Sequence, residues 1–268
     1  MFANIKQKKQ LKSASRKFNV TGEKITKAVI FTVLAVYAVS LLYPFLWMFY
    51  NSFKDIGDWR VNVNGLPTKW IFANYSQNLF TYKSAISGFN IPQMFLLSIG
   101  LTLAGTFLTV FFSTSAAYVV SKYDFWGKKL LYSIAVFVIV VPIVGTLPAK
   151  LQIMQSLGLY DNLVGMLFLY SSAFGMNFIL LHGYFANISW SYAEAAFIDG
   201  ASDVDVFFRI MLPMGKGAVI AVAILQSIGI WNDYSTPLLF LPSMTTLAVG
   251  LDELQKSAIG TADYPTLF

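Results

Sequence analysis

Apolar residues are concentrated in five long runs that alternate with polar segments. A helix needs about 20 mostly apolar residues to cross the hydrocarbon core of a bilayer. The runs are continuous, which favours helices over the alternating strands of a membrane barrel. The pattern predicts an all-α, polytopic membrane protein with about five transmembrane helices, at residues 28–50, 91–120, 130–147, 163–181 and 217–240.

Some of the prolines in or beside these runs bear on where the helices bend or end. Pro44 is predicted to kink the first helix. Pro142 and Pro148 either end the third helix, which we favour, or mark a broken helix of the kind that transporters place near a substrate cavity. The segment from there to Asn162 is predicted to form a short helix at the outer face.

The composition agrees with a membrane protein. Of the 268 residues, 56% are hydrophobic and only 12% are charged, which is about half the charged fraction of a soluble domain. The 24 Phe and six Trp residues fit aromatic anchors at the lipid headgroups. Cysteine is absent from the sequence, which excludes disulfides and thiolate metal sites.

Basic residues set the orientation. Eight of the 19 Lys and Arg residues precede Ala28, and such a cluster before an apolar run stays in the cytoplasm. Residues 1–27 are therefore predicted to be a cytoplasmic head that touches anionic lipid rather than nucleic acid. By alternation, residues 28–240 form a transmembrane domain with a cytoplasmic loop at 184–215. Residues 241–268 then form an extracytoplasmic tail.

Motifs for catalysis are missing. The sequence has no G-x-x-x-x-G-K-[ST] phosphate loop, and its one histidine, His182, has no partners at metal-ligand or triad spacing. The sequence predicts that the chain is not an enzyme, with no catalytic residue, no metal site and no cofactor of its own.

A polar segment at residues 191–213, "SYAEAAFIDGASDVDVFFRIMLP", separates the last two apolar runs. Its four acidic residues cannot lie in lipid. Gly200 permits a sharp turn between two helical pieces, and Pro213 is expected to end the second piece. That piece has Val204, Phe207, Phe208 and Met211 at helical spacing, and an i, i+4 pair of Asp205 with Arg209. The segment is either a docking surface with little side-chain bulk or a solvated connector.

The same segment resembles the EAA loop of bacterial ABC importer permeases. Glu194-Ala195-Ala196, Gly200, Ile210 and Leu212-Pro213 match that motif without a gap. In that family the loop forms a coupling helix that fits a cleft on the ATP-binding subunit. The resemblance implies that the ATPase-coupling residues are Tyr192, Ala193, Glu194, Ala195, Ala196, Asp199, Gly200, Ala201, Phe207 and Arg209.

Other stretches resemble the maltose-type, carbohydrate branch of these permeases, among them "YPFLWMFYNSFK", "AAYVVSKYDFWGKK", "GLYDN" and "IWNDYSTPLLF". The resemblance implies a bacterial cytoplasmic membrane protein. Its implied partners are a second related permease, two ATP-binding subunits that hold ATP and Mg, an extracytoplasmic binding protein and a sugar. Such permeases usually have a sixth span, expected to begin about where this sequence stops.

A polar group inside the fifth apolar run is the candidate substrate path: Trp231, Asn232, Asp233 and Tyr234. A carboxylate at membrane depth costs about 2.5–3.5 kcal/mol, so Asp233 is expected to face the bundle interior. Aromatic stacking with amide and carboxylate acceptors suits a sugar. The alternative is that Asp233 lies at the outer interface and caps a helix or pairs with a neighbour.

Several functional alternatives stay open on the sequence alone. They are an ABC permease for a non-sugar solute such as a glycerol phosphate, an ion-coupled secondary transporter, and a membrane scaffold. The aromatic stretch at residues 59–75 either receives a binding protein or forms an interfacial belt.

Overall fold

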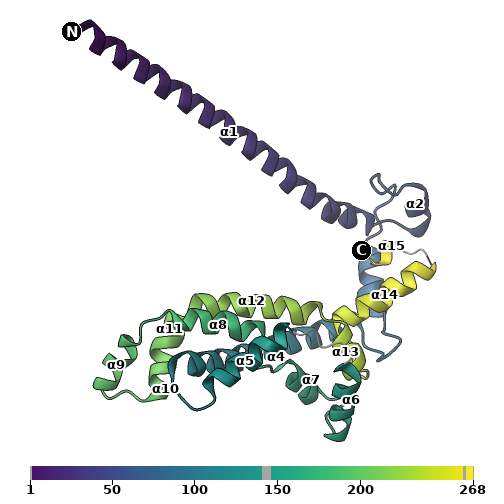
Figure 1. Cartoon of the computed structure of the whole chain (residues 1–268). Coiled ribbons are helices and arrows are strands. Elements are labelled where there is room, and N and C mark those ends of the chain that lie inside the picture. Colours follow the sequence, from purple (N-terminus) through teal and green to yellow (C-terminus); the bar gives the residue numbers. More distant parts are fainter. Residues whose placement is uncertain (1, 141–145, 262–263, 268) are drawn as a thin grey trace. The chain divides into compact units, whose positions relative to one another are not determined.

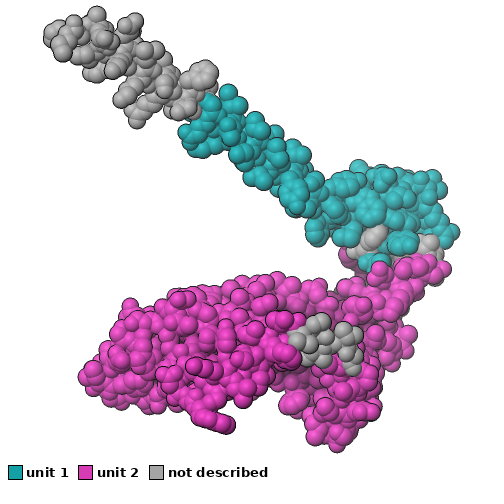
Figure 2. Space-filling model, in the orientation of Figure 1, with its two compact units in different colours: residues 1–74, 261–268 teal, residues 75–260 magenta. Residues whose placement is uncertain are grey.

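The computed structural model describes residues 2–140, 146–261 and 264–267. Figure 1 traces the chain, and Figure 2 colours its two compact units, which are residues 1–74 with 261–268 and residues 75–260. The first is called unit 1 and the second unit 2, and each is described by itself.

Unit 1 begins with one long helix, α1 (Phe2–Asn51), which continues through Pro44. The predicted basic head and the predicted first span are therefore parts of a single helix. Its section Gly22–Asn51 is long and apolar enough to cross a membrane. Unit 1 also contains the short helices α2 (Ile56–Val61) and α15 (Tyr264–Leu267) and the start of α3 (Ala73–Thr81).

A buried lysine orders the loop that follows α1. Lys54 is fully buried, and its ammonium donates hydrogen bonds to the carbonyl oxygens of Asn62 and, at 2.7 Å, Gly65. Asn74 holds the same loop from outside by donating to the carbonyl oxygens of Ser52 and Lys54, both at 2.9 Å. Burial lowers the pKa of Lys54, because desolvation disfavours its charged form.

Unit 2 is built around the long helix α4 (Ile91–Lys122). Its start is fixed by a capping box in which Asn90 accepts from the Gln93 backbone at 3.0 Å and Gln93 accepts from the Asn90 backbone at 3.0 Å. In Figure 1 α4 runs beside α8 (Met176–Ala186) and α12 (Lys216–Asn232), with which it makes its most extensive contacts.

The remaining elements of unit 2 lie around this group. In Figure 1, α9 and α10 lie at one end of the group and α6, α13 and α14 at the other. The bounds are α5 (Lys128–Val140), α6 (Thr146–Ser156), α7 (Leu163–Tyr170), α9 (Ser191–Ile198), α10 (Asp203–Asp205), the π-helix η1 (Val206–Met211), α11 (Leu212–Met214), α13 (Ser235–Phe240) and α14 (Leu247–Thr261).

The fold is helical and multispanning, as expected. Only some of the predicted spans, however, are each formed by a single unbroken helix. Among the described residues, Gly22–Asn51 and Ile91–Lys122 are each long and apolar enough to cross a membrane. The pair Asp203–Met214 and Lys216–Asn232, bent by 77°, would make a third span. Unbroken fourth and fifth helices were therefore wrong predictions, since hydropathy does not register breaks inside an apolar run. The third expected span includes residues 141–145, which lie outside the described residues.

The described helices can be compared with the last three expected spans one by one. The third expected span is helical as α5 up to Val140, and Pro142 lies outside the described residues. Pro148 lies in the first turn of α6, where proline is tolerated, and α6 is the predicted short helix. The fourth expected span is divided into α7 and α8 at residues 171–175, and the fifth into α12 and α13 at residues 233–234.

The tail contains a helix that the sequence pattern did not predict. Glu253 of α14 accepts hydrogen bonds from the Ser84 hydroxyl at 2.8 Å and the Ala85 amide at 3.0 Å. The Ser98 hydroxyl of α4 accepts from the Leu247 amide at 2.8 Å. Part of residues 241–268 is thereby fastened to the loop before α4 and to α4 itself.

Candidate coupling elbow and polar cavity

The segment at residues 191–213, called the elbow below, begins with helix α9 and a turn that only glycine fits easily. The Ala201 amide donates to the Ala196 carbonyl at 2.9 Å, and the Gly200 amide to the Phe197 carbonyl at 3.0 Å. This pair of bonds is a Schellman motif, whose C′ residue takes a left-handed conformation. Gly200 occupies that position with φ 84°.

A second cap starts the next helix within two residues. The Ser202 hydroxyl accepts from the Asp205 amide at 3.2 Å and donates to the Asp205 carboxylate at 2.6 Å. These Ser202 bonds, followed by the charge of Arg209, lower the pKa of Asp205. The predicted Asp205–Arg209 pair is confirmed at 3.3 Å. This ion pair is largely exposed, so it adds little stability. The shape of the elbow is fixed instead by the Schellman motif at Gly200 and the Ser202 cap.

The second piece of the elbow is a π-helix, and this corrects the predicted apolar stripe. The buried residues of η1 are Val206, Phe207 and Met211, whereas Val204 and Phe208 are exposed. An α-helical period placed all four predicted residues on one face, but i→i+5 bonding shifts the face by one residue. Phe207 packs on Tyr118 of α4 with ring centroids 5.0 Å apart.

The end of the elbow also differs from the expectation that Pro213 ends it. Helix α11 continues through Pro213, and the 77° bend comes at Gly215. A side chain at Gly215 would lie 3.0 Å from the Phe185 ring. The absence of a side chain at Gly215 therefore lets α8 approach the bend between α11 and α12 closely.

The elbow presents most of its predicted coupling residues to solvent. Within α9 only Ala193 is fully buried, while Ile198 is 86% exposed and Tyr192 52% exposed. Ala196 and Ala201 are partly covered, and Phe207 is buried against α4. The exposed members are Tyr192, Glu194, Ala195, Asp199, Gly200 and Arg209. The result is a protruding surface that combines small, apolar and acidic groups.

A polar cavity of about 320 Å³ lies at the break between α7 and α8. Asn177 of α8 donates to the Gln226 side chain of α12 at 2.8 Å. The Thr109 hydroxyl of α4 donates to the Tyr170 carbonyl oxygen at the end of α7, which also accepts from the Ser172 amide at 2.9 Å. Ser113 and Ser172 also line the cavity. Irregular backbone at membrane depth is tolerated where it lines a water-filled cavity.

The four predicted path residues differ in their contacts. Trp231 packs edge-on against Phe95 at 5.7 Å, and Asn232 donates to the Ile228 carbonyl oxygen of its own helix at 2.8 Å. Asp233 accepts from the Tyr170 hydroxyl at 3.2 Å and from the Thr236 amide at 3.0 Å. Tyr234 is 46% exposed. Asp233 thus ties the end of α7 to α12 and bonds to the first turn of α13. The assignment of these four residues to a substrate path stays a prediction.

Sequence reasoning missed the residues of the polar cavity. A usable signal was present, because Asn177 and Gln226 are amides inside apolar runs. Such residues are expensive in lipid and face the interior of a bundle. Their partnership spans 49 residues and could not be read from spacing.

These features define a helical membrane protein with an exposed, acidic elbow and a polar cavity. Residues 109–266 match the family described as "Binding-protein-dependent transport system inner membrane component". The chain belongs to this family and is an ABC importer permease, a membrane component that works with other transporter subunits. This membership sets aside the secondary-transporter and scaffold hypotheses.

Individual relatives agree with the family. The chain is 29% identical to a diacetylchitobiose uptake system permease protein of Streptomyces coelicolor, covering 90% of this chain and 78% of the relative. It is 31% identical to a galactooligosaccharides transport system permease protein of Bacillus subtilis, covering 88% and 82%. A solved bacterial ABC transporter involved in import of the acidic polysaccharide alginate matches with a TM-score of 0.74 and 25% identity, covering 92% and 89%.

Proposed function

We propose that this chain is a transmembrane subunit of an ATP-driven importer for a sugar or oligosaccharide. The observation that carries the proposal is the polar cavity at the α7–α8 break, which lies in the same compact unit as the elbow. Hydroxyl and amide groups around the cavity suit a polyhydroxylated solute. Relatives named for galactooligosaccharides and trehalose support a carbohydrate.

The proposed complex contains a second related permease, two ATP-binding subunits and an extracytoplasmic binding protein. The chain itself forms part of the translocation path and transmits movement to it, while ATP and Mg are held by the ATP-binding subunits. The exposed surface of α9, with Glu194 and Gly200, docks in a cleft of one ATP-binding subunit. Closure of those subunits moves the elbow and switches the access of the cavity from one side of the membrane to the other.

The proposed topology follows the distribution of basic residues. Residues 1–27 lie in the cytoplasm, and residues 28–240 form the transmembrane domain in lipid, with the elbow inside a cytoplasmic loop at 184–215. Residues 241–268 lie on the outer side. The substrate path is assigned to the polar cavity together with Trp231, Asn232, Asp233 and Tyr234.

Reconstitution tests the proposal. We expect proteoliposomes that contain this chain with its genetically adjacent permease, ATPase and binding protein to take up an oligosaccharide only when ATP is inside. The solutes tested for uptake should include mono- and oligosaccharides and a glycerol phosphate. Uptake of the glycerol phosphate alone would contradict the carbohydrate assignment. Uptake driven by an ion gradient without ATP would contradict the importer mechanism.

Replacement of Gln226 with leucine tests the cavity. The change removes a side chain that binds Asn177 and leaves the Asn177 amide without its partner. Since lost hydrogen bonds cost about 1 kcal/mol each, and unpaired buried groups more, we expect the apparent KM for uptake to rise about tenfold. Ser227→Ala is the matched control, because Ser227 only donates to the Ile224 carbonyl oxygen of its own helix. Equal uptake kinetics in both variants would remove the cavity from the path.

A further inference from the structure

The end of helix α4 holds the chain on both sides of α9. The Lys122 ammonium donates to the carbonyl oxygens of Ala186, at 3.5 Å, and Ile188, where α8 leads into α9. The next residue, Tyr123, donates its hydroxyl to the Asp203 carboxylate at 2.6 Å. Asp203 begins α10, after the Gly200 turn. Two consecutive residues of one helix end thus fasten both ends of α9 and its turn.

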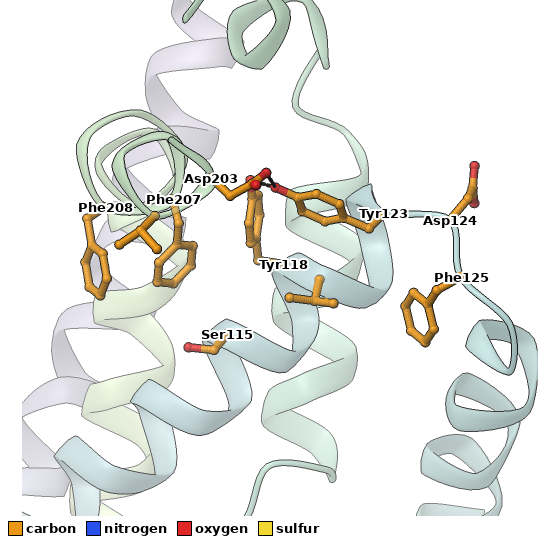
Figure 3. Close-up of a pocket in the computed structure, with 10 residues that line it drawn as sticks. Ser115, Tyr118, Tyr123, Asp124, Phe125, Asp203, Phe207 and Phe208 are labelled. Atoms are coloured by element: carbon orange, nitrogen blue, oxygen red, sulfur yellow. Dashed lines mark hydrogen bonds between the residues drawn. The ribbon is translucent and has the colours of Figure 1, made fainter. Parts of the chain in front are cut away.

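Aromatic contacts reinforce the Tyr123 side of this arrangement. Its ring packs edge-on against Trp190, the residue that precedes α9, at 5.6 Å and against Tyr118 at 5.6 Å. The two tyrosine hydroxyls are 3.2 Å apart. Figure 3 shows Tyr123 directed at Asp203, with Tyr118 beside them and Phe207 on the far side of Tyr118. Burial, followed by the bond to Asp203, raises the pKa of Tyr123, so its hydroxyl remains a donor.

The same helix also reaches the polar cavity. Small and hydroxyl residues recur along one side of α4 and are all buried: Ser98, Thr102, Gly105, Thr109 and Ser113. Thr109 and Ser113 line the cavity at the α7–α8 break. Small residues allow close helix packing in membranes, and α4 packs along both α8 and α12. One rigid helix therefore connects the chain around α9 with the cavity.

We propose that Lys122 and Tyr123 are positioning residues that clamp the elbow to α4. Because of the clamp, α4 moves whenever α9 moves. The movement of α4 then reaches Thr109 and Ser113 at the cavity. When the clamp is open, α9 moves without α4 and ATP is hydrolysed without transport. This inference rests on the proposed function of the chain as an importer subunit.

The decisive measurement is the number of substrate molecules transported per ATP hydrolysed by the reconstituted full transporter. Tyr123→Phe removes only the hydroxyl and retains the ring that packs on Trp190 and Tyr118. A hydrogen bond to a charged group is stronger than one between neutral groups, so we expect transport per ATP to fall about tenfold while the ATPase rate stays within about twofold of the unmodified complex. Lys122→Met, which retains the apolar stem, should act in the same direction.

A double-mutant cycle separates the clamp from unrelated damage. Asp203→Ala removes the other partner of the Tyr123 bond, so the double variant with Tyr123→Phe should be no worse than either single variant. Combination of Tyr123→Phe with Lys122→Met should be worse than either, because it opens both ends. Tyr132→Phe and Lys129→Met, both on α5, are matched controls and should keep the unmodified ratio.

The outcomes distinguish this inference from the proposed function. If the unmodified complex shows no ATP-dependent uptake, the proposed function fails. If it transports, and Tyr123→Phe and Asp203→Ala both keep its transport per ATP, the clamp is wrong. A proportional loss of ATPase and transport in these variants would also overturn it, because the residues would then act on assembly rather than on coupling.

Discussion

Replacement of Gly200 with tryptophan is expected to abolish uptake, by at least about a hundredfold, while the chain still inserts in the membrane. Gly200 has φ 84°, a conformation that costs an L-residue about 1–2 kcal/mol. Apart from the two neighbours of Gly200, no atom of the described residues lies within 4 Å of an added Cβ, so the first atom of a side chain meets no clash there. The loss should come from the ATP-binding subunit, whose cleft the indole ring would obstruct. Uptake and ATPase rates of the reconstituted complex measure it.

The strain and the obstruction can be separated. Gly200→Ala adds the backbone strain without bulk and should lower uptake only a few fold. Gly127 lies between α4 and α5 with φ 89°, and an added Cβ there likewise meets no atom of the other described residues within 4 Å, its two neighbours aside. Gly127→Trp is therefore the matched control and should transport normally. Normal uptake by Gly200→Trp would show that the elbow docks on no partner.

Much of the elbow was readable from sequence because its determinants are local. The Gly200 turn, the two helical pieces and the Asp205–Arg209 pair all depend on residues within a few positions of one another. Acidic residues between apolar runs also exclude lipid as their surroundings. The π-helical register was not readable, since Val206, Phe207 and Met211 are set by packing against α4, far away in sequence.

The interior was less predictable, because hydropathy averages over the residues that break a helix. Residues 171–175 are small or apolar, so the run that contains them looks continuous, although Gly175 adopts φ 154° and the helix stops. The clamp was also out of reach. The Tyr123–Asp203 bond joins residues 80 positions apart, and a single sequence gives no indication of such a pair. The candidate path at residues 231–234 was placed by composition alone, which does not say where each side chain points.

Replacement of Gly165 with valine is expected to prevent α7 from packing against Met154 and the turn at Leu159. A side chain at Gly165 would lie 1.9 Å from the Leu159 carbonyl oxygen and 2.7 Å from the Met154 methyl group. The nearer contact is with backbone, so no rotamer change relieves it, and overpacking of this severity costs more than about 3 kcal/mol. Helix α7 would move, and with it the bonds of Tyr170 to Thr109 and Asp233.

Thermal unfolding of the purified chain in mild detergent measures the loss at Gly165. Gly183→Val is the matched control, because Gly183 lies in α8 and has no atom within 4 Å of an added side chain. We expect Gly165→Val to unfold at a markedly lower temperature than Gly183→Val, and Gly165→Ala to fall between them. Equal unfolding temperatures would mean that α7 does not pack on the turn at Leu159. The α7–α8 break would then have no fixed position from which to form the cavity.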